Sequence, residues 1–295
     1  MITTVVTPTY NRGYLLGRLF ESLKLQTNLD FEWIIVNDGS ADNTDDLVRD
    51  FMKTSPFKVT YIKKENGGKH TALNAAYDSI STPITFIVDS DDYLTIDAIQ
   101  TIADTYNKYK DEKDLCGFSF LRGKPGGGYL SDSGVPENSM KESYVECRMN
   151  RGIGGDMAEA WITKCLIENP FPVYQGERFL SEDIIWVQLS YKYKMRFFNK
   201  VIYMSDYLDD GLTKNRRKHN ISSPNGCVKR AEVFLKANTK WKIKIVSMLQ
   251  LQIYGRFAGK SRKELKQLTD KKMAFDIFWI PSMILWNKWN KEFRK

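Results

Sequence analysis

The chain has 295 residues, of which 42% are apolar and 13% aromatic. This length is enough for one large domain with a sizeable core, and the aromatic content argues against a disordered chain. The four cysteines are scattered without a CxxC pair, so we expect reduced thiols rather than a disulfide framework or a zinc site. The N-terminal residues read as a strand and not as a leader, so we expect no signal peptide and a cytoplasmic chain.

The formal net charge of +8 is unevenly distributed along the chain. Residues 214–295 carry 21 Lys and Arg against 5 Asp and Glu, whereas residues 1–213 carry 23 basic and 31 acidic side chains. A basic tail on an acidic body indicates a localised anionic partner. Nucleic acid and an anionic membrane surface are the two candidates.

The first hundred residues alternate strand and helix patterns. We expect strands over residues 2–7, 33–36, 59–62 and 85–88, and helices over residues 14–26, 42–52 and 71–80. Such alternation predicts an α/β fold in which helices cover both faces of a parallel sheet. Ligands of these folds bind at the carboxyl ends of the strands, so the polar residues that follow each strand matter most.

The remainder of the chain is less regular. Residues 123–128 (GKPGGG) predict a loop or hairpin tip, and residues 228–272 show helical periodicity. The last apolar stretch, residues 273–286, contains Asp276 and Pro281. It is too short and too interrupted to span a bilayer.

Two turns after predicted strands have the chemistry to contact a nucleotide. Asp38 can accept a hydrogen bond from a base N–H, although DGSADN is rich in turn formers and, taken alone, favours an ordinary turn or cap aspartate. Residues 66–69 (NGGK) offer backbone N–H groups and the Lys69 ammonium to a phosphate. This loop is neither a Walker A motif nor a GxGxxG fingerprint, and a plain tight turn is an equal alternative.

Asp89, Asp91 and Asp92 cluster after the strand at residues 85–88. Three close carboxylates repel one another unless a cation lies among them. Mg²⁺ and Mn²⁺ take such hard oxygen ligands and complete their shell with substrate phosphates. We expect Asp92 to cap the following helix, and we favour a metal or ribose role for Asp89 and Asp91.

Glu182 and Asp183 begin a predicted helix. Acidic side chains in a first turn stabilise the helix dipole and Ser181 is a good N-cap, so a structural role is one interpretation. The other is a general base that removes the proton of an acceptor hydroxyl.

In combination these segments resemble the family 2 glycosyltransferases with the GT-A fold. That family typically shows a TPTYNR-like strand, a DGS turn, a GxxxALN helix, a DSDD-type DxD motif and a downstream ED pair. All five occur here in order, at residues 7–12, 38–40, 68–74, 89–92 and 182–183. Residues 154–161 also look like the acceptor-side element of the family, and the resemblance fades past about residue 237.

The resemblance implies a Rossmann-like, mostly parallel GT-A sheet flanked by helices. Its halves would be a nucleotide-sugar half over residues 1–105 and an acceptor half over residues 106–213, followed by a basic helical extension over residues 214–295. It implies inverting transfer of a sugar from a nucleotide diphosphate sugar, UDP by default, to a hydroxyl of a polysaccharide or lipid-linked glycan. The implied nucleotide contacts are Thr7, Pro8, Tyr10, Arg12, Asp38, Lys69, Asp89 and Ser90. Asp91 is implied as the ligand of Mn²⁺ or Mg²⁺, and Asp183 as the base.

Three further side chains rank lower as site residues. Glu182 accompanies Asp183. We slightly favour contact of His70 with donor phosphate over a partly exposed position, because it adjoins Lys69. His219 lies in KNRRKHN, where some relatives place metal- or diphosphate-binding groups, but a solvated basic loop is favoured.

Other classes of protein fit less well. A sugar-phosphate nucleotidyltransferase would show a glycine-rich, basic N-terminal signature, which TPTYNRGYLL lacks. A nucleic-acid-binding module would show a compact motif or stacking aromatics, so no nucleic acid is expected. The intact DxD and ED sets disfavour a non-catalytic nucleotide binder. Self-association stays open.

The C-terminal segment has the composition of an interfacial membrane anchor. Aromatic residues there are followed by basic ones, namely Phe275, Phe278, Trp279, Trp286 and Trp289, then Lys291, Arg294 and Lys295. We predict peripheral docking on the inner face of the cell membrane, since each basic residue near an anionic surface adds about 1 kcal/mol. The alternative is that these aromatics pack onto the catalytic domain or into a dimer interface.

Overall fold

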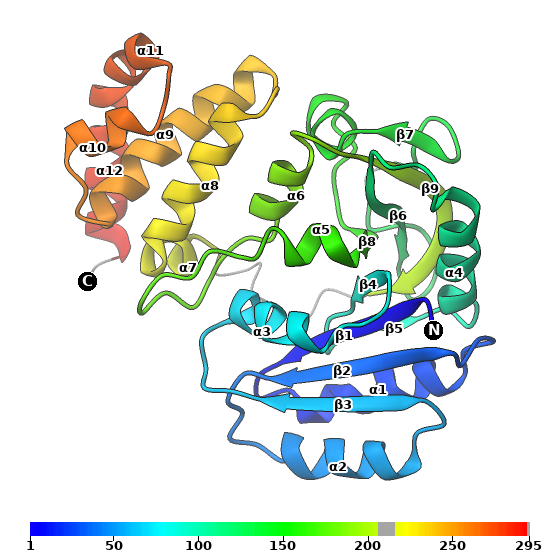
Figure 1. Ribbon diagram of the computed structural model, residues 1–295. Helices are drawn as coiled ribbons and strands as arrows, with labels where there is room; N and C mark the ends of the chain where they lie inside the picture. Colours follow the sequence, from blue (N-terminus) through cyan, green and yellow to red (C-terminus); the bar gives the residue numbers. More distant parts are fainter. Residues whose placement is uncertain (132, 206–215, 294–295) are drawn as a thin grey trace.

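The computed structural model describes residues 1–131, 133–205 and 216–293 (Figure 1). Its described strands form one sheet of nine strands in the order β3-β2-β1-β4-β8-β6-β9-β5, with β7 beside β9. The strands are β1 (Thr3–Thr9), β2 (Phe31–Asn37), β3 (Lys58–Lys63), β4 (Ile84–Ile87), β5 (Tyr93–Leu94), β6 (Leu115–Gly123), β7 (Met140–Glu142), β8 (Met157–Ile162) and β9 (Lys194–Met204).

Helices flank the sheet and make up the C-terminal part of the chain. The sheet-flanking helices are α1 (Gly13–Lys24), α2 (Thr44–Thr54), α3 (Lys69–Ala76), α4 (Ala98–Tyr109), α5 (Thr163–Ile167) and α6 (Asp183–Leu189), with short helical turns at Tyr77–Ser79 and Val145–Asn150. The C-terminal helices are α7 (Arg216–Ser222), α8 (Pro224–Lys236), α9 (Trp241–Phe257), α10 (Arg262–Gln267), α11 (Lys272–Ile277) and α12 (Trp279–Phe293).

The N-terminal half of the sheet has the predicted parallel arrangement. β1 pairs in parallel with β2 and β4, and β2 pairs in parallel with β3. β1 and β2 are buried along their whole length, because helices cover both faces, and residues 33–36 of β2 form a continuous apolar run. The carboxyl ends of β1, β2 and β4 therefore meet at one edge of the sheet, where the predicted motifs follow.

The second half of the sheet is mixed. β8 runs antiparallel to β4 and β6, whereas β6 and β9 pair in parallel. After β6 the GKPGGG segment makes the predicted tight turn, in which the Gly127 N–H donates to the Lys124 carbonyl over 3.0 Å. Gly126, Gly127 and Gly128 all have positive φ there, a conformation that glycine adopts without strain.

Two apolar clusters fill the two faces of the sheet. One lies under α1, α2 and α4 and contains Trp33 and Phe86. The other lies under α3, α5 and α6, where the Trp161 and Trp186 rings stack with centroids 4.0 Å apart. The expected α/β class with helices on both faces is confirmed, and this packing holds the edge of the sheet rigid around the motifs.

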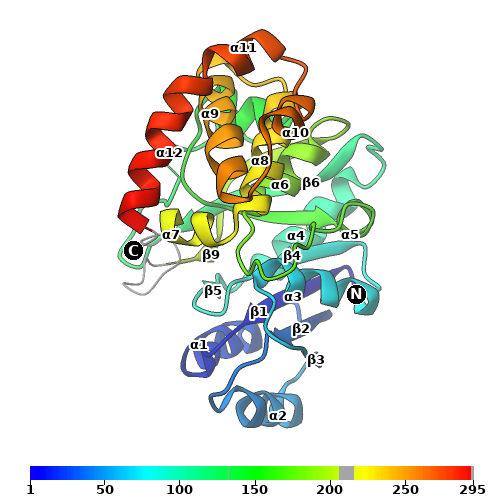
Figure 2. The same ribbon diagram turned by 90° about the vertical axis from the view of Figure 1, so that its left-hand side faces the viewer.

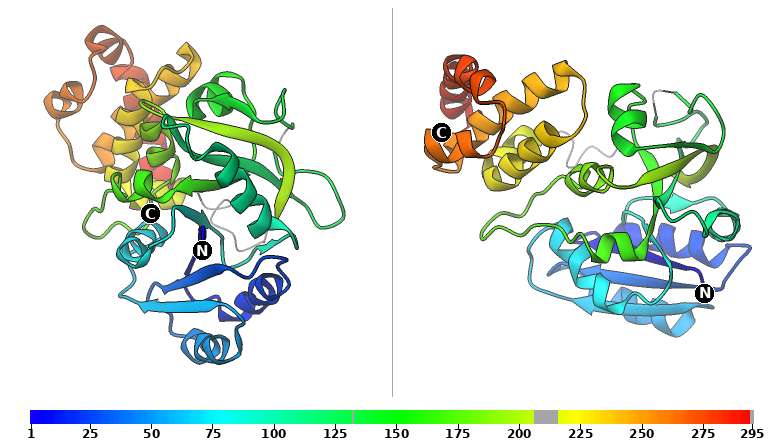
Figure 3. Two further views of the ribbon diagram at one scale, coloured as in Figure 1. Left: turned by 45° about the vertical axis from the view of Figure 1, so that its right-hand side comes forward. Right: turned by 45° about the horizontal axis from the view of Figure 1, so that its top comes forward.

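The basic C-terminal segment forms a helical unit with its own core. Figures 2 and 3 show α8 to α12 gathered beside the sheet, with α12 along the outer side of α9. Residues of α8 serve two cores: Val233 and Phe234 join the cluster under α6, while Val228 and Ala231 join the cluster of the C-terminal helices. α8 thus connects the helical unit to the part of the chain that forms the sheet. The division of the chain into domains stays a prediction.

The C-terminal aromatics lie largely inside this unit. Phe275 is fully buried, and Trp279, Trp286 and Trp289 pack partly buried against the cluster between α9 and α12. The prediction that these rings form an exposed anchor is therefore wrong for Phe275, and the alternative of packing within the protein holds for it. Within the described residues, no helix combines the length and the hydropathy that crossing a bilayer requires.

Candidate active site

The carboxylates that follow β4 meet basic side chains from several elements. Asp91 accepts a hydrogen bond from Arg12 Nη1 over 2.7 Å, and Arg18 donates to the Asp91 carbonyl. Asp91 and Arg12 are both partly exposed at the edge of the sheet. The segment TPTYNR thus reaches the DxD motif through its arginine.

Asp89 is neutralised by two cations from other elements. Lys69 Nζ lies 2.5 Å from its carboxylate, and Arg122 lies 3.8 Å away. Burial raises the pKa of Asp89, but Lys69 and Arg122 outweigh it and hold the carboxyl ionised, with a pKa below its ordinary value. Lys69 also pairs with Glu182 over 2.6 Å, so one ammonium joins the DxD and ED motifs.

Asp92 does not cap a helix, contrary to the prediction. The short strand β5 follows it, and Asp97 occupies the position before α4. Asp92 is 4% exposed and accepts a hydrogen bond of 2.7 Å from the Tyr203 hydroxyl, with Arg122 at 3.5 Å. Burial and the nearby Asp89 charge raise its pKa to about 7.

Asp38 shapes the NGGK loop. Its carboxylate accepts the N–H of Gly67 over 3.0 Å and that of Gly68 over 2.7 Å, and it pairs with Lys64 over 2.7 Å. Gly68 has φ +93°, and a Cβ there would lie 2.0 Å from the Arg178 carbonyl oxygen, so only glycine fits. The turn interpretation of Asp38 therefore holds, since it organises the loop that positions Lys69, and its contact with a nucleotide base stays a prediction.

The remaining nucleotide-contact predictions differ in accessibility. Thr7 is fully buried and its hydroxyl accepts the Trp33 indole N–H over 2.9 Å, whereas Tyr10 is exposed at the edge. Pro8, in β1, and Ser90, in the DxD turn, are both buried. Any contact of these residues with a nucleotide stays a prediction, and for Thr7 it would have to come from the backbone.

His70 is only 2% exposed, so the partly exposed alternative is wrong. Burial lowers its pKa, which keeps the ring neutral at pH 7. Nδ1 has no hydrogen-bond partner within the described part of the chain. His219 lies in α7 and stacks on Phe179, with ring centroids 5.7 Å apart, instead of in an open loop.

The two residues of the ED pair contact different parts of the protein. Glu182 pairs with Lys69 and so belongs to the DxD side. Asp183, the first residue of α6, accepts from Arg230 Nε over 2.9 Å and from Arg230 Nη2 over 2.6 Å. Burial raises the pKa of Asp183, but Arg230 outweighs it and lowers the pKa below its ordinary value, so the carboxylate is ionised and able to accept a proton.

Three site residues were missed by the sequence analysis. Arg122 stacks over the Tyr203 ring at 4.1 Å, and its position at the end of the apolar run in β6 was an available signal. Glu159, in the acceptor-side element, lies near Arg148 and Arg122, and burial raises its pKa to about 7. Arg230 comes from α8, beyond the motifs, and no local pattern marks it.

The residues present fit a divalent cation at Asp91. Among the described residues, no cluster of three or more His, Cys, Asp or Glu side chains could hold a metal ion by itself. Asp89 and Asp92 are committed to Lys69, Arg122 and Tyr203, whereas Asp91 pairs with Arg12 through Oδ2 and is partly exposed. One carboxylate with substrate phosphates as the remaining ligands is an arrangement that Mg²⁺ and Mn²⁺ accept.

A mixed α/β sheet with carboxylates at the carboxyl ends of its parallel strands defines a GT-A-type fold. Residues 4–139, a little under half of the chain, match the model of the family described as Glycosyl transferase family 2. Its resemblance to that family is therefore confirmed.

Two curated relatives share part of the chain. Glycosyltransferase GlyA of Streptococcus pneumoniae is 32% identical over 34% of this chain and 14% of its own length. The poly(ribitol-phosphate) beta-N-acetylglucosaminyltransferase TarS of Staphylococcus aureus is 24% identical over 75% of this chain and 37% of its own length. The chain thus spans well under half the length of either relative.

Solved structures share the fold. TarS in complex with UDP-GlcNAc superposes with a TM-score of 0.61 and 19% identity, over 96% of this chain and 79% of that one. The mannosyltransferase PcManGT of Pyrobaculum calidifontis, in complex with GDP-Man and Mn²⁺, gives 0.59 and 16%, over 98% and 83%. The expected GT-A fold class is confirmed by these likenesses.

The raised pKa of Glu159 predicts a pH dependence of stability. Its carboxyl binds a proton in the folded state up to about pH 7, but in the unfolded state only up to about 4.5, so ionising it costs stability as the pH rises from 4.5 to 7. Glu159→Gln cannot titrate, so its melting temperature should fall by several degrees less than that of the wild type between pH 5 and 8. Thermal denaturation of both proteins at a series of pH values measures this. Parallel pH profiles for the two would show that Glu159 ionises freely.

Proposed function

We propose that this protein is an inverting glycosyltransferase. It would transfer a sugar from a nucleotide diphosphate sugar, with UDP as the preferred nucleotide, to a hydroxyl of a polysaccharide or lipid-linked glycan precursor. The observation that carries the proposal is the chain of ion pairs from Asp89 through Lys69 to Glu182, which sets the ED pair directly across from the DxD motif. The match of residues 4–139 to the family model and the nucleotide-sugar complexes of TarS and PcManGT support it.

The donor would lie along the edge of the sheet. Arg12 and Lys69 supply positive charge for a diphosphate, and Asp38 holds the glycine loop in place. Contact of Asp38 with the base stays part of the proposal, and a calorimetric titration of Asp38→Ala with UDP tests it. A Mn²⁺ or Mg²⁺ ion held by Asp91 would neutralise charge that develops on the leaving diphosphate.

Asp183 would perform the proton transfer. Its carboxylate takes the proton of the acceptor hydroxyl while that oxygen bonds to the anomeric carbon and the bond from this carbon to the diphosphate breaks. Attack from the side opposite the leaving group inverts the anomeric centre. Arg230 keeps the carboxylate ionised and fixes its orientation through a two-pronged hydrogen bond.

Asp91→Ala should abolish metal-dependent donor turnover. Release of UDP from a UDP-sugar in the presence of Mn²⁺ should fall about 100-fold or more, because charge on the leaving group would no longer be neutralised. The melting curve should stay close to that of the wild type, since Asp91 is partly exposed. Asp104→Ala, which removes an exposed carboxylate of α4, is the matched control. Wild-type UDP release by Asp91→Ala would refute the assignment.

Asp183→Asn should lower kcat by about 10²- to 10⁴-fold, the usual contribution of a general base, and leave donor affinity unchanged. The amide oxygen can still accept from Arg230, so the fold should persist. Steady-state kinetics together with a UDP titration separate the two effects. Glu182→Gln is the informative comparison, because a loss of kcat in that variant alone would move the base to Glu182.

We propose further that the C-terminal helices dock on an anionic membrane surface, but through side chains other than the predicted aromatics. An exposed apolar ridge runs along α11 and α12, with Met273, Ile277, Ile280 and Ile284 between 62% and 81% exposed. Exposed lysines adjoin it in the sequence at Lys272 and Lys288. Apolar side chains flanked by lysines suit the headgroup region of anionic lipids.

Replacing Ile277, Ile280 and Ile284 together by serine should abolish salt-sensitive co-sedimentation with anionic vesicles. These side chains point away from the core, so the melting temperature should change little. Leu25→Ser removes an equally exposed leucine at the far end of α1 and should bind vesicles like the wild type. If the triple variant still co-sediments, or the wild type ignores anionic vesicles at low salt, the docking proposal fails.

A further inference from the structure

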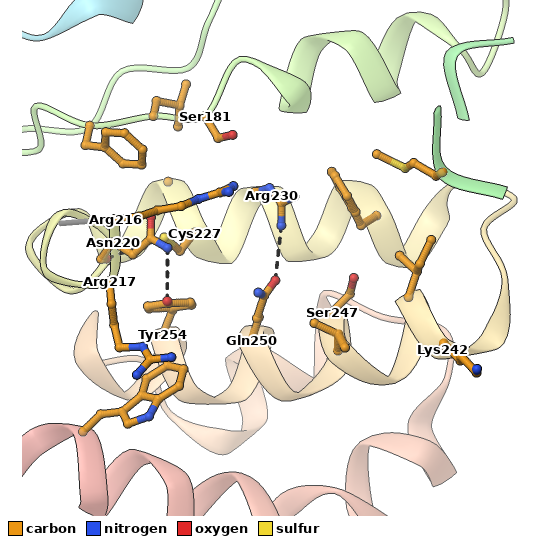
Figure 4. Close-up of a pocket in the computed structure, with 18 residues that line it drawn as sticks. Ser181, Arg216, Arg217, Asn220, Cys227, Arg230, Lys242, Ser247, Gln250 and Tyr254 are labelled. Carbon is orange, nitrogen blue, oxygen red and sulfur yellow. Dashed lines mark hydrogen bonds between the residues drawn. The ribbon is translucent and has the colours of Figure 1, made fainter. Parts of the chain in front are cut away.

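A cavity of about 690 Å³ lies between the start of α6 and the C-terminal helices α7, α8 and α9. Figure 4 shows it from the side, with Ser181 above and α9 below. Its volume is in the range of pockets that hold small ligands. None of the motifs that define the family lines it, so the donor chemistry does not account for this space.

The cavity carries concentrated positive charge. Arg216, Arg217, Arg230 and Lys242 line it, and no acidic side chain does so among the described lining residues. Figure 4 shows the Arg216 side chain extended along α8 toward Arg230. Arg230 is paired with Asp183, and an anion in the cavity could accept hydrogen bonds from Arg216 together with the remaining donor of Arg230.

The other lining groups suit a polar organic ligand. Arg217 stacks over the Trp289 ring at 4.7 Å, which holds its guanidinium in place. Arg230 Nη1 reaches Gln250 only over 3.3 Å, and Tyr254 accepts from Asn220 over 3.2 Å. Such long hydrogen bonds leave donors available, because they are weaker than bonds at ordinary distance.

The cavity adjoins the proposed base. Arg230 lines it and holds the Asp183 carboxylate, and Ser181, another lining residue, hydrogen-bonds the same carboxylate. Glu182, by contrast, faces Lys69 and the DxD motif. The ED pair therefore lies between the donor cluster and the cavity, and the cavity is on the Asp183 side of the pair.

We infer that this cavity binds a phosphate ester of the acceptor, next to the hydroxyl that is glycosylated. This rests on the proposed function, since it assigns a substrate class to the acceptor side of that same site. Arg216 and Arg230 are the groups that hold the ester oxygens, as guanidinium groups bind phosphate through paired N–H donors. The acceptor class is thus a hydroxyl compound that carries a phosphate.

Calorimetric titration with glycerol 3-phosphate, inorganic phosphate and neutral glycerol, at constant ionic strength, tests the inference. Wild-type protein should bind glycerol 3-phosphate more tightly than inorganic phosphate, and glycerol not at all. Arg216→Gln should weaken binding of glycerol 3-phosphate by about tenfold or more, the effect of one charged hydrogen bond. Arg216→Lys, which keeps the charge, should retain part of the affinity, and Lys263→Gln, an exposed site with the same loss of charge, should retain all of it.

The outcomes separate this inference from the proposed function. UDP affinity should be unchanged in Arg216→Gln, because the donor cluster lies across the ED pair. If the wild-type protein does not bind UDP, the proposed function is refuted, whether or not the protein binds glycerol 3-phosphate. Equal binding of inorganic phosphate and the ester, or equal losses in Arg216→Gln and Lys263→Gln, would overturn the inference. So would binding confined to phosphatidylglycerol vesicles, which would mark a lipid headgroup instead of a soluble acceptor.

Discussion

The paired contact of Lys69 with Asp89 and Glu182 is the interaction on which the site depends. Lys69, the first residue of α3, lies 2.5 Å from Asp89, which follows β4, and 2.6 Å from Glu182, which precedes α6, so an unpaired member of this group would be costly. Burial disfavours a charged Lys69, but the two carboxylates outweigh it and raise its pKa, so the ammonium persists. Lys69 takes this position because Asp38 orders the glycine loop that precedes it. A turn aspartate thereby positions a contact between two motifs over 90 residues apart in the sequence.

Most of the catalytic fold follows from local patterns. The alternation of buried strands and amphipathic helices predicted β1 to β4 and α1 to α3 with only small shifts of their ends, because strands covered on both faces are rich in apolar and β-branched residues. The antiparallel entry of β8 between β4 and β6 was not predictable in the same way. Its sequence, MAEAWI, contains a glutamate, which breaks the apolar pattern of a buried strand. This glutamate, Glu159, lies near Arg122 and Arg148. Strand order is decided by contacts between distant segments, which periodicity does not report.

The site residues likewise fall into those that local sequence patterns reveal and those that they do not. Residues that act where their own strand ends, such as Asp89 and Asp91, are visible in the sequence because strand ends are the binding edge of a parallel sheet. The helix-capping role predicted for Asp92 was wrong because β5 lies between Asp92 and α4. A strand of two residues leaves no recognisable pattern in the sequence. Arg230 could not be found at all: it lies 47 residues after Asp183 and meets it only because α8 packs against α6. Side chains that contribute through packing of distant helices need the tertiary structure.

The position of α8 explains why the basic segment is more than an appendage. Its apolar residues are shared between the sheet-side core and the core of the C-terminal helices, so moving it would expose both. The same helix presents Arg230 to Asp183, and its Cys227 and Gly226 line the cavity. Positive charge on this segment thus lies on the Asp183 side of the ED pair, whereas the acidic first half carries the carboxylates that follow β4. The charge asymmetry along the sequence corresponds to two sides of one charged cluster, with Glu182 and Asp183 at the boundary.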